Sequence, residues 1–244
     1  MESEHIVKSF DKDLASLDHG IAQMGGLVEL QLAQAFESLV KRDVDLAREV
    51  VAADKAIDEM ESDIHMRAVR LLGLRQPIAN DLREVIAAFQ TASELERIGD
   101  YARNIAKRTT ALIKLPPVGF AAQSIVRMGG VVQNMVKGVL DAYQARDTSL
   151  ADDIRKRDQE VDQLHTSLFR ELLTYMMEDP HNITTCTHLL FISKNVERMG
   201  DHATNIAEHI HMIVFGHDPD TERPKQDQSS VTVVEVSEEK QAED

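Results

Sequence analysis

The chain has 244 residues, a formal net charge of −15 at pH 7, few aromatic side chains and no tryptophan. Many Ala, Leu, Glu, Met and Arg residues with little Gly or Pro favour long helices over sheets. The negative charge and the lack of any basic run argue against nucleic acid as a partner. No apolar stretch is long enough to span a membrane, and the polar, acidic N-terminus is unlike a signal peptide. Together with a single cysteine, Cys186, these features predict a cytoplasmic protein without disulfides.

The first part of the chain predicts three helices. The first covers about residues 10–41 and contains three glycines that weaken it, Gly20, Gly25 and Gly26. The second helix follows Asp43, a suitable N-cap, and has apolar residues at alternating spacings of four and three. Its predicted apolar seam consists of Leu46, Val50, Ala53, Ile57, Met60 and Ile64. The third helix begins after Pro77 and runs to about residue 113.

The rest of the chain repeats this scheme after a linker with paired prolines, Lys114–Gly119. The fifth helix is capped by Asp147 or Thr148, and Asp179–Asn182 breaks the chain before the sixth. The predicted seam of the fifth helix is interrupted by one polar residue, Arg157. This seam consists of Leu150, Ile154, Arg157, Val161, Leu164 and Leu168.

An internal repeat is the clearest pattern in the sequence. The phrase ERIGDYARNIA at 96–106 returns as ERMGDHATNIA at 197–207, and the stretch at 24–39 matches the one at 128–143, both beginning MGG. Such a long period indicates a tandem duplication rather than a solenoid. Short connections between consecutive helices favour antiparallel packing.

We therefore predict an all-α protein built from two three-helix bundles. The first bundle covers residues 1–114 and the second covers 115–216. Residues 217–244 are rich in acidic residues and lack an apolar periodicity, which predicts a disordered acidic tail.

Each repeat carries two pairs of carboxylates spaced four residues apart. On a helix this spacing places both side chains of a pair on one face. The eight residues are Asp54, Asp58, Glu96, Asp100, Asp158, Asp162, Glu197 and Asp201. With the seam above, Asp54 and Asp58 are expected on one flank of their helix, not at the centre of its buried face.

Four carboxylates that converge from two adjacent helices would repel one another, so they would take up protons or bind cations. Oxygen ligands suit hard cations such as Mg, Mn, Ca or iron, and His65, His165 and His202 are near enough in sequence to modify that choice. Gly99 and Gly200 occupy matching places beside the carboxylates, which predicts close approach of another helix or of a ligand there.

Other interpretations stay open. The carboxylates are equally compatible with a solvated face or with an ion network that uses Arg97, Arg103, Lys194 and Arg198. No Gly-rich phosphate loop, nucleophile elbow or Ser-His-Asp arrangement is present, so we predict no catalytic residues and no enzyme activity. A metal-storage bundle or metalloenzyme and a plain helical scaffold are the alternatives.

The duplicated unit, the paired carboxylate motifs and the two repeated phrases closely resemble the PhoU family of bacterial regulators of phosphate uptake, over about residues 5–215. The resemblance implies a cytoplasmic, non-enzymatic and often homodimeric regulator. It also implies two partners, the ATPase subunit of the phosphate ABC transporter and the phosphate-sensing histidine kinase. Such a protein works at the membrane through these partners, restrains phosphate uptake and keeps the phosphate-starvation (Pho) regulon off.

The resemblance also bears on cofactors. Family members carry metal ions or clusters at these motifs, which implies that all eight carboxylates are metal ligands here. The metal is left open among Mg, Mn, Fe and Zn.

Overall fold

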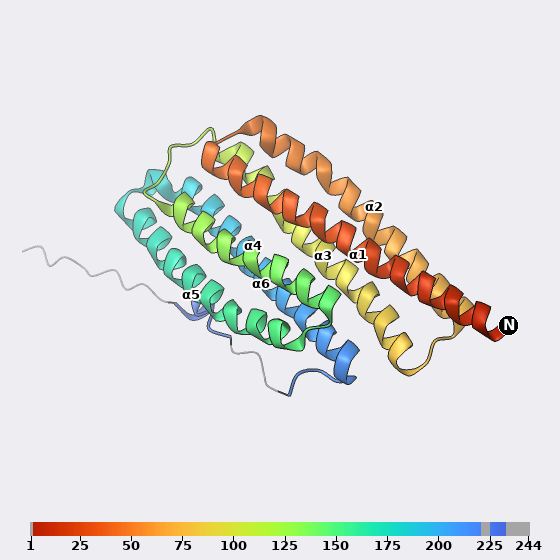
Figure 1. The fold of residues 1–244 in the computed structure, drawn as a ribbon. Coiled ribbons are helices and arrows are strands. Elements are labelled where there is room, and N and C mark those ends of the chain that lie inside the picture. The colour runs from red at the N-terminus through yellow and green to blue at the C-terminus, as the bar shows by residue number, and fades with distance from the viewer. Residues whose placement is uncertain (1, 221–224, 233–244) are drawn as a thin grey trace, which may run out of the picture.

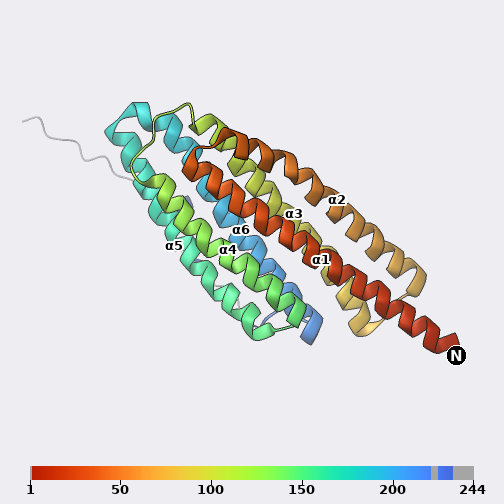
Figure 2. The ribbon, with the colours of Figure 1, turned by 45° about the horizontal axis from the view of Figure 1, so that its top comes forward.

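The computed structural model describes residues 2–220 and 225–232, and its regular structure in those ranges is entirely helical. The six α-helices are α1 (Glu2–Lys41), α2 (Val44–Arg75), α3 (Ala79–Leu112), α4 (Ala121–Ala145), α5 (Thr148–Glu178) and α6 (Ile183–Phe215). Two short 3-10 turns are η1 (Pro180–Asn182) and η2 (Ser229–Val231). Helices α1–α3 form one elongated bundle and α4–α6 form a second beside it (Figures 1 and 2), which confirms the predicted fold class. Within the described ranges, no helix combines the length and the apolarity needed to cross a membrane.

Side-chain caps set the predicted starts of α2 and α5. Asp43 accepts hydrogen bonds from the backbone N–H groups two and three residues further on, and Asp147 does the same in the second repeat. Asp147 is therefore the cap and Thr148 is the first residue of α5. Asp179 caps η1 and separates α5 from α6, as the break at 179–182 predicted.

The two bundles meet along α1 and α4 and along α3 and α6. Gly25 of α1 lies against Leu140 of α4, where a Cβ on the glycine would be 2.7 Å from the leucine side chain. Its duplicate, Gly129 of α4, lies against Phe36 of α1, where a Cβ would be 2.5 Å from the ring. The contact is reciprocal, so the repeats are related by a pseudo-two-fold axis that runs between α1 and α4.

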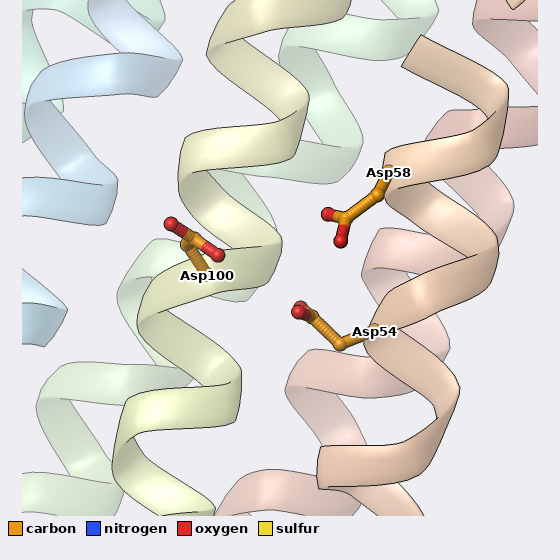
Figure 3. Close-up of side chains that lie close together, drawn as sticks. All are labelled: Asp54, Asp58 and Asp100. Atoms are coloured by element: carbon orange, nitrogen blue, oxygen red, sulfur yellow. The ribbon is translucent and has the colours of Figure 1, made fainter. Parts of the chain in front are cut away.

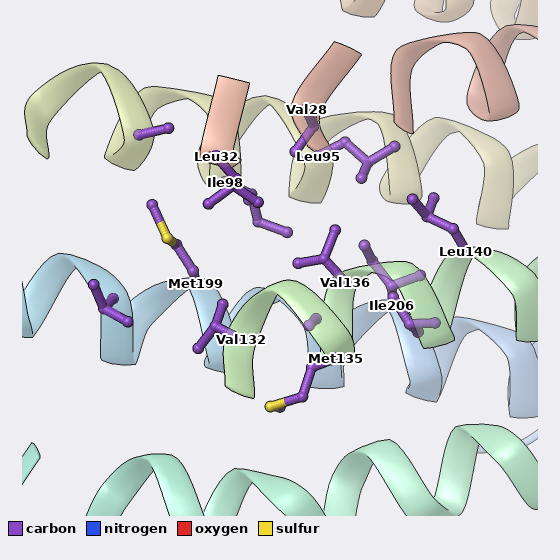
Figure 4. Packing of buried hydrophobic residues seen from close by; sticks show 14 of the residues in the cluster. Val28, Leu32, Leu95, Ile98, Val132, Met135, Val136, Leu140, Met199 and Ile206 are labelled. Atoms are coloured by element: carbon purple, nitrogen blue, oxygen red, sulfur yellow. The ribbon is translucent and has the colours of Figure 1, made fainter. Parts of the chain in front are cut away.

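A continuous apolar core crosses this boundary (Figure 4). It includes the fully buried side chains Val28, Leu32, Leu95, Ile98, Val132, Val136, Met199 and Ile206. Because four helices from both repeats contribute to it, the two bundles share a core, and each supports the carboxylate-bearing face of the other.

The predicted seams of α2 and α5 are wrong at one position in each repeat. Ala53 and Arg157 are exposed, while the next residues, Asp54 and Asp158, are buried. Each helix packs between two neighbours, so its buried face is wider than the seam of a two-stranded coiled coil and is centred closer to the carboxylates. Asp54 is therefore part of the buried face and not on its flank, whereas Asp58 is exposed.

Part of the predicted tail is described. Residues 217–220 follow α6, and residues 225–232 lie against α5 with η2 among them (Figure 1). The prediction of disorder for 221–224 and 233–244 falls outside the described residues.

Candidate functional site

Helices α2 and α3 bring the carboxylates of the first repeat together. We call Asp54, Asp58, Glu96 and Asp100 the first acidic cluster. Asp54 and Asp58 project from successive turns of α2 toward Asp100 on α3 (Figure 3). One oxygen from each of these three aspartates lies within 4.8 Å of the others, the only such group of His, Cys, Asp or Glu in the part of the chain that is described. Asp54 is buried and Asp58 exposed, so the group opens to the surface.

Arg103 supplies a positive charge inside the first acidic cluster. Its guanidinium contacts Asp54 and lies 2.7 Å from Oδ1 of Asp100. Gln31 on α1 donates a hydrogen bond of 3.1 Å to Asp54, while its own Oε1 is buried without a hydrogen-bond partner. The more exposed Arg97 lies 3.6 Å from Oε2 of Glu96 and 3.8 Å from Oδ2 of Asp100. The ion-network interpretation thus accounts for Asp54, Glu96 and Asp100, but two guanidinium groups do not neutralise four carboxylates.

The remaining carboxylates of the cluster hold their protons more tightly than usual. Burial, followed by the nearby charge of Asp100, raises the pKa of Glu96 to about 7. Burial and the charges of Asp54 and Asp100 also raise the pKa of Asp58. Such a group favours any cation that reaches it, because a bound cation relieves the repulsion that raises these pKa values.

Gly99 allows the helices that carry the cluster to approach closely. A Cβ at Gly99 would be 3.0 Å from Oε1 of Gln31 and 3.1 Å from Cδ1 of Ile57. A Cβ at Gly200 would be 3.0 Å from Oδ1 of Asp158. The close approach of another helix predicted at both glycines is confirmed.

The second repeat presents its carboxylates differently. We call Asp158, Asp162, Glu197 and Asp201 the second acidic cluster. The first three are buried and Asp201 is half-buried. Among the described residues, no three ligand atoms of this cluster lie as close together as those of the first. The structure therefore gathers three of the four predicted ligands of the first repeat, with Glu96 alongside, and spreads those of the second.

Contacts within the second acidic cluster are also different. Lys194 Nζ lies 2.8 Å from Oε1 of Glu197, whose Oε2 is buried without a hydrogen-bond partner. Burial raises the pKa of Glu197 against the lowering effect of Lys194. The backbone N–H of Gln226 donates to Oδ2 of Asp162 at 2.7 Å. Sequence analysis missed this contribution of the tail, since no local pattern links residue 226 to α5.

The three neighbouring histidines bond to other groups. His65 Nε2 lies 3.0 Å from the carbonyl oxygen of Phe89, and His165 Nδ1 lies 2.7 Å from Oγ of Ser193. His202 contacts a carboxylate of α3 outside both clusters. The clusters consequently offer oxygen ligands only, a donor set that fits Mg²⁺, Mn²⁺ or iron better than Zn²⁺.

Fold and site together define a class of all-helical, internally duplicated proteins with one carboxylate cluster per repeat. The PhoU domain model matches residues 21–109 and again 125–210. The chain belongs to the PhoU family.

Curated relatives match nearly the whole chain. The phosphate-specific transport system accessory protein PhoU homolog of Caulobacter vibrioides is 48% identical over 225 residues, which are 92% of this chain and 98% of that protein. The protein of the same name from Rhizobium meliloti is 45% identical over 94% of this chain and 97% of its own length.

Solved structures show the same fold. PhoU from Pseudomonas aeruginosa has a TM-score of 0.82 and 38% identity, covering 85% of this chain and 99% of that one. The phosphate transport system regulatory protein PhoU from Streptococcus pneumoniae has a TM-score of 0.80 and 30% identity, with 87% and 100% covered.

Proposed function

We propose that this chain is a non-enzymatic regulator of phosphate uptake and phosphate signalling. The observation that carries the proposal is the match of both repeats to the PhoU domain, together with relatives named as accessory proteins of phosphate-specific transport. These relatives align with the chain over both bundles, so the proposal concerns the whole duplicated unit and not one half of it.

In this role the protein acts in the cytoplasm, as a homodimer, between two partners. It binds the ATPase subunit of the high-affinity phosphate ABC transporter and the phosphate-sensing histidine kinase. When phosphate is ample, it restrains uptake and keeps the kinase from switching on the phosphate-starvation regulon. The elongated bundles offer long helical faces for such docking (Figure 2).

A cation at the first acidic cluster is the second part of the proposal. Asp54, Asp58 and Asp100 would hold it, with Glu96 beside them, and the cation would supply positive charge that offsets their repulsion. Because Asp54 and Asp58 belong to α2 and Asp100 to α3, occupancy would fix the relative position of these two helices. Docking of the partners on this face would then depend on occupancy.

Replacement of one exposed ligand tests the cation part. Asp58→Asn should lower the manganese bound per chain after equilibration with Mn²⁺, while Glu59→Gln, at an exposed residue of the same helix that pairs with Lys55, should not. Equal manganese content in the two variants would remove Asp58 from the ligand set. Many ions per chain would instead favour the storage alternative.

A phosphatase reporter of the starvation response tests the regulatory part. In a strain that lacks the gene for this chain, grown with ample phosphate, the reporter should stay on, and the wild-type gene should switch it off again. A reporter that stays off in the deleted strain would reject negative regulation of this regulon and leave the family membership unchanged.

A further inference from the structure

The two acidic clusters differ at the position of the built-in cation. Arg103, which bridges Asp54 and Asp100 in the first cluster, is replaced by Thr204 at the same place in the repeated phrase. Thr204 is fully buried and neutral, and its hydroxyl donates to the carbonyl oxygen of Asp201 at 2.7 Å. At this place in the repeat, the second cluster therefore has a neutral hydroxyl where the first has a guanidinium.

Residues 225–232, which we call the C-terminal strap, bring a positive charge and a hydrogen-bond donor to the second cluster. The ammonium group of Lys225 lies 3.9 Å from Oδ1 of Asp201. The backbone N–H of Gln226 donates to Oδ2 of Asp162, a buried carboxylate, at 2.7 Å. One short segment thus contacts both helices that carry the second cluster.

Further contacts hold the strap in place. The backbone N–H of Gln228 donates to Oγ1 of Thr166 on α5 at 3.2 Å. Asp227 pairs with Lys194 of α6 at 3.1 Å and also accepts a hydrogen bond from the backbone N–H of Ser229. Because the strap is tied to both α5 and α6, its place over the second cluster is specific.

We propose that the strap competes with a cation for the second acidic cluster, so that the two duplicated sites are not equivalent. The first cluster is open to a divalent cation, whereas the second takes one only when the strap leaves. This inference rests on the cation part of the proposed function, and it adds that a segment outside the six helices occupies the carboxylates of one of the two sites.

Competition follows from the contacts. A cation that binds Asp162 and Asp201 must displace the ammonium of Lys225 and compete with the Gln226 N–H for Oδ2 of Asp162. The buried Oε2 of Glu197, which has no hydrogen-bond partner among the described residues, is a further oxygen for the incoming ion. The apparent affinity of the second cluster for the cation equals its intrinsic affinity multiplied by the fraction of molecules in which the strap is open.

A variant that opens the strap without changing charge tests the proposal in the full chain. Gln226→Pro removes the N–H that binds Asp162, and Gln226→Ala at the same position keeps it and serves as the matched control. Thr166→Val, which removes the acceptor for Gln228, loosens the strap from the α5 side. Binding of Mn²⁺ is followed by the electron paramagnetic resonance signal of the free ion, and helix content is checked by circular dichroism.

We expect the wild type and Gln226→Ala to bind one Mn²⁺ per chain tightly and a second one weakly. Gln226→Pro and Thr166→Val should bind the second ion at least tenfold more tightly than the wild type does. Identical isotherms for the wild type, Gln226→Pro and Thr166→Val, at any stoichiometry, would overturn the proposal. The wild-type isotherm alone reports on the first cluster, so failure of the cation proposal there is distinguishable from failure of the strap.

Hydrogen exchange gives a second readout on the wild type. Backbone amides of the strap should exchange faster as Mn²⁺ fills the second cluster, and Asp162→Asn should abolish that acceleration. Exchange that stays unchanged over the concentration range in which the wild type takes up its second ion would overturn competition.

Discussion

At the scale of single residues, Arg103 holds the first acidic cluster together when no other cation is bound. Its removal leaves Asp54, whose side chain is only 4% exposed, buried beside like charges. We expect Arg103→Ala to lower the free energy of unfolding by about 3 kcal/mol. Arg97→Ala, at a side chain 60% exposed, should cost about 0.5 kcal/mol or less. Urea unfolding without divalent ions measures both, and equal costs would contradict this role of Arg103.

Glu96 should give the free energy of unfolding a distinct dependence on pH. Its pKa is raised from 4.5 to about 7 in the folded protein, so the folded state binds the proton more tightly than the unfolded state does. Its contribution to stability is therefore complete below about pH 4.5 and is lost as the pH rises through about 7. Glu96→Gln should remove this loss, leaving roughly 2 kcal/mol more stability at pH 8 relative to pH 5 than the wild type retains. Unfolding curves at both pH values measure it, and parallel behaviour of the two proteins would contradict the raised pKa.

Much of the site was predictable at this scale because the duplication repeats each ligand position. Asp54 and Asp58 share a helix face because they are four residues apart, and both approach Asp100 because α2 and α3 are neighbours. Gln31 and the strap residues were not predictable, since they reach the clusters only through tertiary packing. The exposed position of Asp58 also required the structure.

At the scale of elements, the two adjacent glycines of each MGG motif have different surroundings. Substitutions at them can therefore distinguish the effect of helix packing from that of helix propensity. Gly25 and Gly129 face the neighbouring bundle, whereas Gly26 and Gly130 have nothing within 4 Å of an added Cβ. We expect Gly129→Ala to cost about 2 kcal/mol through overpacking against Phe36.

The adjacent glycine provides the control. Gly130→Ala should stabilise the protein by about 0.5–1 kcal/mol. Alanine fits this helical position, and it lowers the conformational entropy of the unfolded chain relative to glycine. Thermal or urea unfolding of both variants decides the matter, and a shift of the same sign in each would contradict the pseudo-two-fold packing of α1 on α4.

The helices themselves were predictable from caps and breaks, but the buried face of α2 was not. Apolar patterning selected Ala53 because a buried, unpaired carboxylate is costly. The structure buries Asp54 instead, since Gln31 and Arg103 satisfy it. Patterning therefore failed at the very positions that form the candidate site, where local preference gives way to the chemistry of the cluster.

At the scale of the whole molecule, the two repeats pack around one shared apolar core and so form a single packed body. Helices α3 and α6 carry Glu96 with Asp100 and Glu197 with Asp201, and they pack against each other along the boundary between the bundles. A shift of α3 at the first cluster would therefore be felt directly by α6, the helix that carries part of the second cluster, because the two helices are in contact.

Uptake of radiolabelled phosphate by intact cells, grown with ample phosphate, tests the central claim most directly. A strain that lacks the gene should take up phosphate faster than its parent, and expression of this chain should restore the slower rate. Expression of Asp58→Asn should restore it less well than expression of Glu59→Gln. Uptake that is the same with and without the gene would contradict a role in restraining phosphate transport.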